Sequence, residues 1–374
     1  SAVFRAALVG LVGFSSLAAQ AEPKYSVLRL NLISRDGAGL NDLGQVAGSY
    51  RSPDFEFQYQ AALTRPNQPV NPATDILTPL VFGRPGQALG VNNLGQAVGS
   101  FSPTLDYEPR AFRTQPNSPV NLDTDNLMPG LSNRLSGGGW GINNLGQAVG
   151  NNGLFAFRTS PNGEPLQIFN LGGLFGRGAF ANDINDLGQV TGSSAGLAYR
   201  TGPNQPIKPA DALEPLGPTG QNSGADINNQ GVVVGYGELS FLGDYHAFRA
   251  IPGHVTEDLG TLNGSHHSYA SAINEAGWIV GSSNFRPNSN DFFHAVLWHD
   301  GMILDLNDLI PPLVPGTDSI LEIALDINNH GQILGWSSGE LFLLTPVVPE
   351  PSSFMVLAGM SLSLLIFRTK NSRA

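Results

Sequence analysis

The chain of 374 residues has no cysteine, and only 13% of its residues are charged. Without cysteine, neither disulfides nor thiolate metal sites can stabilise the fold, and a cysteine nucleophile is excluded. The charged fraction is about half that of an ordinary soluble domain. Acidic residues outnumber basic residues by 30 to 19, which gives a net charge of −11. Nucleic acids and anionic lipid surfaces are therefore poor partners, and no nucleic-acid ligand is expected.

Long helical patterns are also lacking, and a repeated phrase of nine residues is present instead. Each of its seven copies reads apolar residue, Asn, polar residue, any residue, Gly, and a short apolar run ending in Gly. Successive copies are 42 to 54 residues apart. Such a period indicates one supersecondary unit that stacks on copies of itself. The Asn and Gly residues of the copies are Asn41 and Gly44, Asn92 and Gly95, Asn143 and Gly146, Asn185 and Gly188, Asn228 and Gly231, Asn274 and Gly277, and Asn328 and Gly331.

Four strand-like segments make up each repeat. The first ends at the Asn, the second begins after the Gly, the third contains an Ala-Phe-Arg type phrase as at 247–249, and the fourth follows as at 255–259. The short segment between Asn and Gly predicts a tight hairpin, because Gly adopts the left-handed conformation at no steric cost. The Asn side chain can bond the backbone two residues on. These residues are therefore interpreted as structural turn residues, and no chemistry is needed to explain their recurrence.

Four strands in a repeat of this length are typical of a β-propeller blade, so the sequence predicts an all-β, seven-bladed propeller of four-stranded blades. A β-solenoid is the alternative, although solenoid coils are usually shorter and more uniform. The first segment of the body, residues 25–30, reads as a lone fourth strand, and the last blade ends with third-strand residues 341–344. We therefore expect the N-terminal strand to complete the last blade and close the ring. The small residues beside the Asn phrase place the first strand innermost.

The N-terminal segment has the features of a secretory signal peptide. Residues 6–19 are apolar and rich in small side chains, Arg5 precedes them, and Ala19-Gln20-Ala21 has the form of a cleavage site. This pattern predicts a signal peptide over residues 1–21. An N-terminal membrane anchor or a buried strand is the alternative interpretation.

The C-terminal segment, residues 347–374, carries a second signal. Pro349-Glu350-Pro351 is followed by the apolar residues 354–367 and then by basic residues. This order resembles the PEP-CTERM sorting signal of Gram-negative bacteria that make exopolysaccharide. The resemblance implies an exosortase-type processing enzyme as a partner. The short apolar run fits transient anchoring in the inner membrane, with the repeats outside at the cell surface or in the extracellular space.

The body, residues 22–346, resembles the HAF-repeat family of bacterial extracellular proteins. Three segments carry the resemblance in one repeat: His246-Ala247-Phe248, the Asp-Leu-Gly-Thr-Leu segment at 258–262, and Ile273-Asn274. The first four repeats depart from the family pattern, because another residue replaces the His. The family has no established activity, so the resemblance supports secretion and fold and implies no reaction.

Two metal sites are conceivable, but the sequence favours neither, and no cofactor is expected. Residues 226–231 resemble the start of a calcium loop, and Asp183 and Asp326 open similar copies, yet the fifth and ninth loop positions lack carboxylates. Zinc is the second alternative, because His266, His267, His294 and His299 could converge. Adjacent histidines on one strand, however, point to opposite faces.

The sequence contains no recognisable catalytic constellation, because serine, histidine and aspartate are present at spacings that predict no triad. Arginines recur at one strand position and are interpreted as a solvated blade surface, with binding of an anionic glycan as the alternative. They are Arg113, Arg158, Arg200 and Arg249. The sequence thus predicts a secreted, non-catalytic binding or structural component of the cell surface or exopolysaccharide matrix, with a polysaccharide or a surface protein as partner. The alternative functions are a propeller-type polysaccharide lyase or hydrolase and a purely structural coat component.

Overall fold

The computed structural model describes residues 24–33, 37–51, 59–78, 86–102, 109–121, 124–125, 127, 137–153, 155–164, 166–241, 243–285, 293–313 and 319–347. The expected signal peptide and the sorting motif Pro349-Glu350-Pro351 lie outside the described residues. Within the described part of the chain, no helix is long and apolar enough to span a bilayer.

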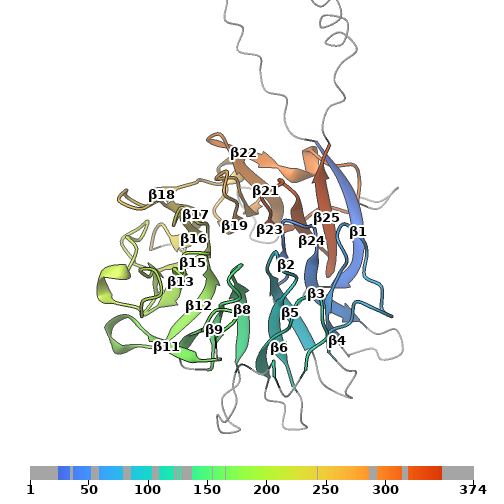
Figure 1. Ribbon diagram of the computed structural model, residues 1–374. Helices are drawn as coiled ribbons and strands as arrows, with labels where there is room; N and C mark the ends of the chain where they lie inside the picture. The colour runs from blue at the N-terminus through green and yellow to red at the C-terminus, as the bar shows by residue number, and fades with distance from the viewer. Residues whose placement is uncertain are drawn as a thin grey trace, which may run out of the picture.

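The strands form seven blades around a central axis, with the first strand of each blade innermost (Figure 1). The predicted seven-bladed propeller is therefore confirmed, and the solenoid alternative is wrong. The strands are β2 (Gly39–Leu40), β3 (Val46–Arg51) and β4 (Tyr59–Leu63) in blade 1; β5 (Gly86–Val91), β6 (Ala97–Phe101) and β7 (Arg110–Arg113) in blade 2; β8 (Gly138–Ile142), β9 (Ala148–Asn151), β10 (Ala156–Thr159) and β11 (Ile168–Gly172) in blade 3; β12 (Ala179–Ile184), β13 (Val190–Ser194) and β14 (Leu197–Arg200) in blade 4; β15 (Asn222–Ile227), β16 (Val233–Glu238), β17 (Tyr245–Ala250) and β18 (Glu257–Asp258) in blade 5; β19 (Ser268–Ile273), β20 (Ile279–Asn284), β21 (Phe293–His299) and β22 (Met302–Asp305) in blade 6; and β23 (Ile323–Ile327), β24 (Ile333–Ser337), β25 (Glu340–Pro346) and β1 (Tyr25–Ile33) in blade 7. Single turns of 3-10 helix, η1 (Leu174–Gly176), η2 (Pro209–Asp211), η3 (Leu262–Gly264) and η4 (Leu306–Asp308), lie in the connections.

The N-terminal strand β1 closes the ring, as the sequence predicts. It pairs antiparallel with β25, where Ser26 faces Thr345. Between Arg29 and Ile33 the register with β25 shifts at an irregularity where Asn31 adopts a left-handed φ of 57°. Ile33 then pairs with Glu340 of β25 on one side and with Ser49 of blade 1 on the other. One strand therefore completes blade 7 and also contacts blade 1, so the edge that β25 would expose is covered.

The fourth strand is the least regular part of the blades. In blade 1 its place is taken by a short segment bonded to β4 through Leu63 N to Asp75 O (2.9 Å) and Leu77 N to Ala61 O (2.8 Å). In blade 4 the bond from Leu213 N to Ala198 O (2.9 Å) has the same role. An outermost strand has one neighbouring strand, so few hydrogen bonds are needed to hold it.

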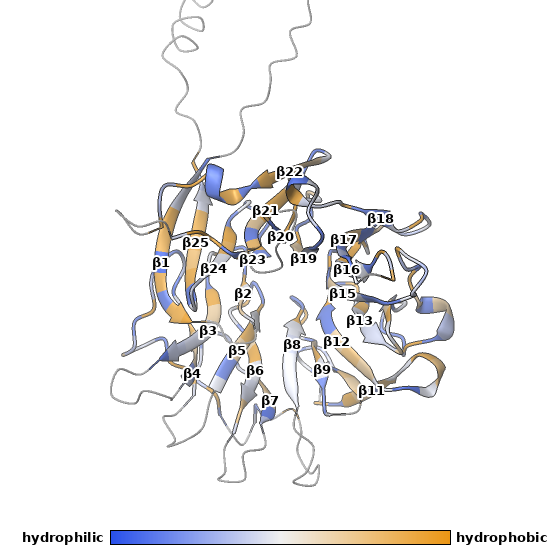
Figure 2. Ribbon diagram, turned by 180° about the vertical axis from the view of Figure 1, so that it is seen from behind, coloured by the Kyte–Doolittle hydropathy of each residue, from blue (hydrophilic) through white to orange (hydrophobic). Residues whose placement is uncertain are grey.

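The core consists of apolar clusters between adjacent blades. The aromatic residue of the recurring third-strand phrase supplies the largest fully buried side chains, which are Phe112, Phe157, Tyr199 and Phe248. Phe157 of blade 3, for example, packs in one cluster with Val98 and Ala111 of blade 2. Figure 2 shows the hydrophobic colour following strands such as β1 and β21. Burying each such ring contributes about 1.5–3 kcal/mol, so the phrase recurs because every interface between blades needs it.

The recurring arginines correct the expectation of a solvated blade surface. Arg200 Nη1 donates to the carbonyl oxygens of Gly231 (2.9 Å) and Ala250 (3.3 Å) in the next blade. Arg158, which is 5% exposed, donates to Asn204 O at 3.1 Å, and Arg113 bonds Gly146 O of blade 3. Three of the four guanidinium groups therefore join neighbouring blades. Only Arg249 pairs within its own blade, with Glu257 at 2.7 Å.

Candidate functional site

The seven Asn–Gly phrases lie at one end of the propeller axis, where each forms the turn between the first and second strands. In blade 1, the carbonyl oxygen of Asn41 accepts the N–H of Gly44 at 3.0 Å, and Asn41 Oδ1 accepts the N–H of Leu43 at 3.1 Å. Gly44 has a φ of 77°. The same backbone bond recurs from Gly95 to Asn92, Gly146 to Asn143, Gly188 to Asn185, Gly231 to Asn228, Gly277 to Asn274 and Gly331 to Asn328.

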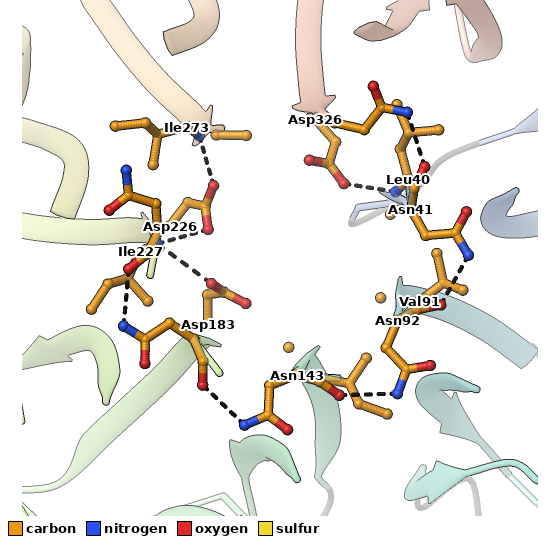
Figure 3. A pocket seen from close by; sticks show the side chains of 18 of the residues that line it. Leu40, Asn41, Val91, Asn92, Asn143, Asp183, Asp226, Ile227, Ile273 and Asp326 are labelled. Atoms are coloured by element: carbon orange, nitrogen blue, oxygen red, sulfur yellow. Dashed lines mark hydrogen bonds between the residues drawn. The ribbon is translucent and has the colours of Figure 1, made fainter. Parts of the chain in front are cut away.

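The Asn side chains also form a closed ring of hydrogen bonds around the axis (Figure 3). Nδ2 of each Asn donates to the carbonyl oxygen of the Asn in the next blade, at 2.9 to 3.3 Å, beginning with Asn41 to Asn92. The bond from Asn328 to Asn41 O (3.0 Å) closes the ring. Each Asn therefore joins two neighbouring blades by a hydrogen bond, in addition to forming its own turn.

A second ring runs beside the first. The backbone N–H of the residue after each Asn donates to the side-chain oxygen of the equivalent residue one blade on, as from Asp42 to Asn93 (2.8 Å) and from Asn329 back to Asp42 (2.9 Å). The other five bonds span 2.7 to 2.9 Å. The amide groups at this end of the axis are thus committed to one another, which leaves few of them for a ligand.

The residue before each phrase adapts to the gap between blades. Where it is glycine, the strands are in contact, because a methyl group at Gly39 would lie 2.8 Å from the Cα of Gly90. Where it is aspartate, the carboxyl group can reach the backbone of the next blade. Asp226 accepts the N–H of Ile273 and Asp326 accepts that of Leu40, both at 2.7 Å.

These residues line an axial cavity of about 290 Å³. Burial and the neighbouring Asp226 raise the pKa of Asp183 well above its ordinary value, and burial raises the pKa of Asp326 to about 7. In Asp226 and Asp326 one carboxyl oxygen accepts an N–H of the next blade and the other accepts the N–H of the following residue, so both oxygens bond backbone donors rather than line a loop as calcium ligands. Among the described residues, no three acidic or histidine side chains converge as metal ligands would.

The histidines have other contacts. His246 Nδ1 lies 2.9 Å from Asp258 and His294 Nδ1 lies 2.6 Å from Asp305, so the His of the third strand pairs with the Asp of the fourth strand in blades 5 and 6. Burial opposes ionisation of Asp305, but the hydrogen bonds from His294 and Asn307 outweigh it and lower its pKa. His299 packs on Trp278, with ring centroids 4.3 Å apart. The zinc alternative therefore gains no support from this arrangement.

The opposite end of the axis, here called the loop face, carries the connections between blades and between second and third strands. Three tyrosines from blades 5 and 6 meet there: Tyr236 near the end of β16, Tyr245 at the start of β17 and Tyr269 near the start of β19. The ring of Tyr236 lies 5.1 Å from that of Tyr269 and 6.1 Å from that of Tyr245. Tyr245 and Tyr269 are stacked at 6.3 Å, and His267 stacks on Tyr269 at 6.4 Å.

The tyrosines line one side of a cavity of about 520 Å³, here called the tyrosine pocket. Its other walls are Ser193 and Gly196 of blade 4 and Gln221, Asn222 and Ser223 of blade 5. Burial, followed by the neighbouring tyrosines, raises the pKa of Tyr269, so its hydroxyl stays neutral in ordinary solution. This volume falls within the usual range of ligand pockets. The lining offers aromatic faces, hydroxyls and amides, and none of the described residues in it is an aspartate, glutamate, lysine, arginine or histidine.

The sequence-based expectations did not include this pocket. Tyr236 and Tyr269 belong to different blades, and their convergence depends on the curvature of the ring. The available signal was their phase, since each lies one residue from the glycine or alanine that pairs in the middle of the first and second strands: Tyr236 follows Gly235, and Tyr269 precedes Ala270. None of the predicted turn residues lines the tyrosine pocket.

Comparison with known proteins supports the fold. No protein-family model matches the chain. No curated protein matches it either. Among solved structures, a streptogramin B lyase is similar with a TM-score of 0.51 and 11% identity, over 87% of this chain and 98% of that chain. A virginiamycin B lyase from Staphylococcus aureus gives a TM-score of 0.48 and 11% identity, over 87% of this chain and 100% of that chain. At such low identity the likeness to the streptogramin B lyase shows a β-propeller fold and nothing about activity.

Proposed function

We propose that this protein is a secreted, non-catalytic binding component of the cell surface or exopolysaccharide matrix, and that it holds a polysaccharide in the tyrosine pocket. The observation that carries the proposal is the lining of this pocket, which combines three aromatic rings with hydroxyl and amide groups. Tyrosine offers a large, rigid and amphipathic contact surface that loses little entropy on binding. Sugar rings present apolar faces and hydroxyl edges, and such a lining complements both.

The alternative, a propeller-type lyase or hydrolase, has weaker support. Glycoside hydrolysis uses a pair of carboxylates across the scissile bond, whereas none of the described residues that line the tyrosine pocket is acidic. His267, which stacks on Tyr269, is a candidate base, but its Nδ1 accepts the backbone N–H of Tyr245 at 3.2 Å, which commits one ring nitrogen to the fold. The propeller fold shared with a streptogramin B lyase is compatible with many activities.

Cosedimentation with exopolysaccharide from the producing bacterium tests the proposal. The wild-type protein should sediment with the polymer, and Tyr245→Ala should bind at least about tenfold more weakly, as expected for loss of a central aromatic anchor. Tyr59→Ala is the matched control, because Tyr59 begins β4 at the position in blade 1 that Tyr245 holds in blade 5, and it does not line the pocket. Equal binding by the two variants would contradict the proposal. New reducing ends or unsaturated sugars in the same mixtures would establish the enzymatic alternative.

A further inference from the structure

The tyrosine pocket continues onto an exposed aromatic ring of blade 4. Phe180 of β12 pairs with Ser193 of β13, and Tyr269 of β19 pairs with Ser282 of β20, so Phe180 and Tyr269 hold equivalent positions two blades apart. Residues paired across antiparallel strands lie on the same face of a sheet. Phe180 therefore stands beside Ser193, which lines the pocket.

Phe180 is exposed to solvent, and the connection between the second and third strands of its own blade is too short to cover it. Its side chain is 52% exposed, whereas the phenylalanines of the recurring third-strand phrase, Phe112, Phe157 and Phe248, are fully buried. The connection between β13 and β14 consists only of Ala195 and Gly196, and nothing lies within 4 Å of the position that a Gly196 side chain would take. The surface between Phe180 and the tyrosine pocket is thus open and made of small residues.

The described side chains that line this surface are uncharged, and the carboxylate that pairs next to it, Glu238 opposite Tyr245, would repel an anionic ligand. Ser193 and Ser223 offer hydroxyls, and Gln221 offers a primary amide. The side chain of Asn222 is already engaged, because its Oδ1 accepts the N–H of Ala198 at 2.7 Å. A ligand carrying one charge per sugar would lose hydration here without gaining an ionic partner, which is costly.

We propose that the loop face binds a linear, uncharged oligosaccharide segment, with one sugar ring in the tyrosine pocket and a later ring on Phe180. The proposal rests on the function proposed above and specifies its ligand class and the extent of its site. Ser193 and Ser223 lie between the two aromatic surfaces and hydrogen-bond the hydroxyl edge of the sugar chain. Affinity is therefore expected to increase with chain length until both surfaces are covered.

Titration calorimetry with defined oligosaccharides tests this inference. The neutral probes are cello-, malto-, laminari- and manno-oligosaccharides from the disaccharide to the hexasaccharide, and the anionic probes are oligogalacturonate and oligoalginate. At least one neutral series should bind, and its hexasaccharide should bind at least about tenfold more tightly than its disaccharide. Phe180→Ala should abolish this gain with length and leave disaccharide affinity unchanged. Phe169→Ala is the matched control, since Phe169 is an exposed phenylalanine on the outermost strand β11.

Each contrary result has its own meaning. Tighter binding of the anionic probes, or no binding of any neutral series, would overturn the inferred ligand class. An unchanged length dependence in Phe180→Ala would overturn the extended site. In these cases the broader proposal survives if Tyr245→Ala still releases the protein from the exopolysaccharide. If Tyr245→Ala sediments like the wild type, the proposed function itself falls, whatever the oligosaccharides do.

Discussion

At the scale of single residues, the asparagine of each phrase uses its two side-chain atoms for different purposes. In Asn143, Oδ1 accepts the N–H groups of Leu145 and Gln147 and thereby holds its own turn. Nδ2 donates to Gln147 Oε1 and to the carbonyl oxygen of Asn185 in the next blade, both at 2.9 Å. Asn143 is only 4% exposed, so water cannot replace a lost partner.

Asn143→Asp separates these two contributions. The aspartate keeps the acceptor for the turn but loses the donor, and it places a second oxygen against two acceptors. We expect the free energy of unfolding to fall by about 2–4 kcal/mol, measured by urea denaturation. Asn170→Asp is the control, because Asn170 is exposed and its Oδ1 likewise accepts a backbone N–H, from Gly172 at 2.8 Å. A similar loss in both variants would mean that the ring contributes little.

The raised pKa of Asp326, about 7, makes a prediction for the pH dependence of stability. Between about pH 4 and pH 7 the folded protein retains a proton that the unfolded chain releases, so stability falls as the pH rises through this window. Asp326→Ala removes the effect. The stability advantage of the wild type over this variant should therefore decrease from pH 4 to pH 7, by at most about 1.4 kcal/mol per pH unit.

Thermal or urea denaturation at several pH values measures this difference. Ala272→Gly is the matched control, because Ala272 holds the position in blade 6 that Asp326 holds in blade 7 and cannot titrate. A difference between wild type and Asp326→Ala that does not change with pH would contradict the prediction.

Sequence reasoning reached the turns but missed the partners across blades. The spacing from Asn41 to Gly44 requires a tight turn, and that requirement is local. The acceptor of the Asn41 amide is Asn92 O, which lies 51 residues away, and only the geometry of the ring brings the two together. The same reason explains why Arg200 was interpreted as solvated although it bonds Gly231. Long-range partners of this kind depend on how blades pack, and no local pattern encodes them.

At the scale of secondary-structure elements, the sequence predicts the order of the strands, but it does not predict how regularly each strand is hydrogen-bonded. The phase of the repeat predicts that β1 completes blade 7, because a ring of blades cannot leave β25 unpaired. The irregular fourth segments of blades 1 and 4 were expected as strands. Their few hydrogen bonds follow from their outer position, where Asp75 O accepts the N–H of Leu63 and Ile76 forms an isolated bridge with Ala62 of β4.

A disulfide between β1 and β25 would measure how much this closure contributes. Ser26 and Thr345 are directly paired, and paired residues of antiparallel strands lie at distances that a disulfide can bridge. Because the chain has no other cysteine, Ser26→Cys with Thr345→Cys can form only this bond within one molecule. The oxidised protein should be more stable than the reduced protein by up to about 4 kcal/mol, since the loop it closes is very long.

Urea denaturation with and without reductant gives this difference, and Ser26→Cys alone controls for the substitution. Equal unfolding midpoints for the oxidised and reduced double variant would contradict the prediction, because they would show that the covalent link between β1 and β25 adds no stability.

At the scale of the whole molecule, the two hydrogen-bond rings and the strand closure join every blade to two others. An open repeat array can lose terminal units one at a time, whereas a closed ring has no terminal unit. We therefore expect one cooperative unfolding transition. Tryptophan fluorescence reports on blades 3, 6 and 7 through the four tryptophans Trp140, Trp278, Trp298 and Trp336, and far-ultraviolet circular dichroism reports on all strands. The two curves should coincide, and Asn143→Asp should shift both equally. Separate transitions would contradict the prediction.

The proximity of Lys24 and Val347, the first and last described residues, in blade 7 has a consequence for how such a protein can be rearranged. The N–H of Val347 donates to the carbonyl oxygen of Lys24 at 2.7 Å, so a short glycine and serine linker can join these residues without moving either strand. Once they are joined, the polypeptide can be opened between any two blades. Any blade can then come first in the polypeptide, and circular permutants beginning at each blade are expected to fold to the same structure.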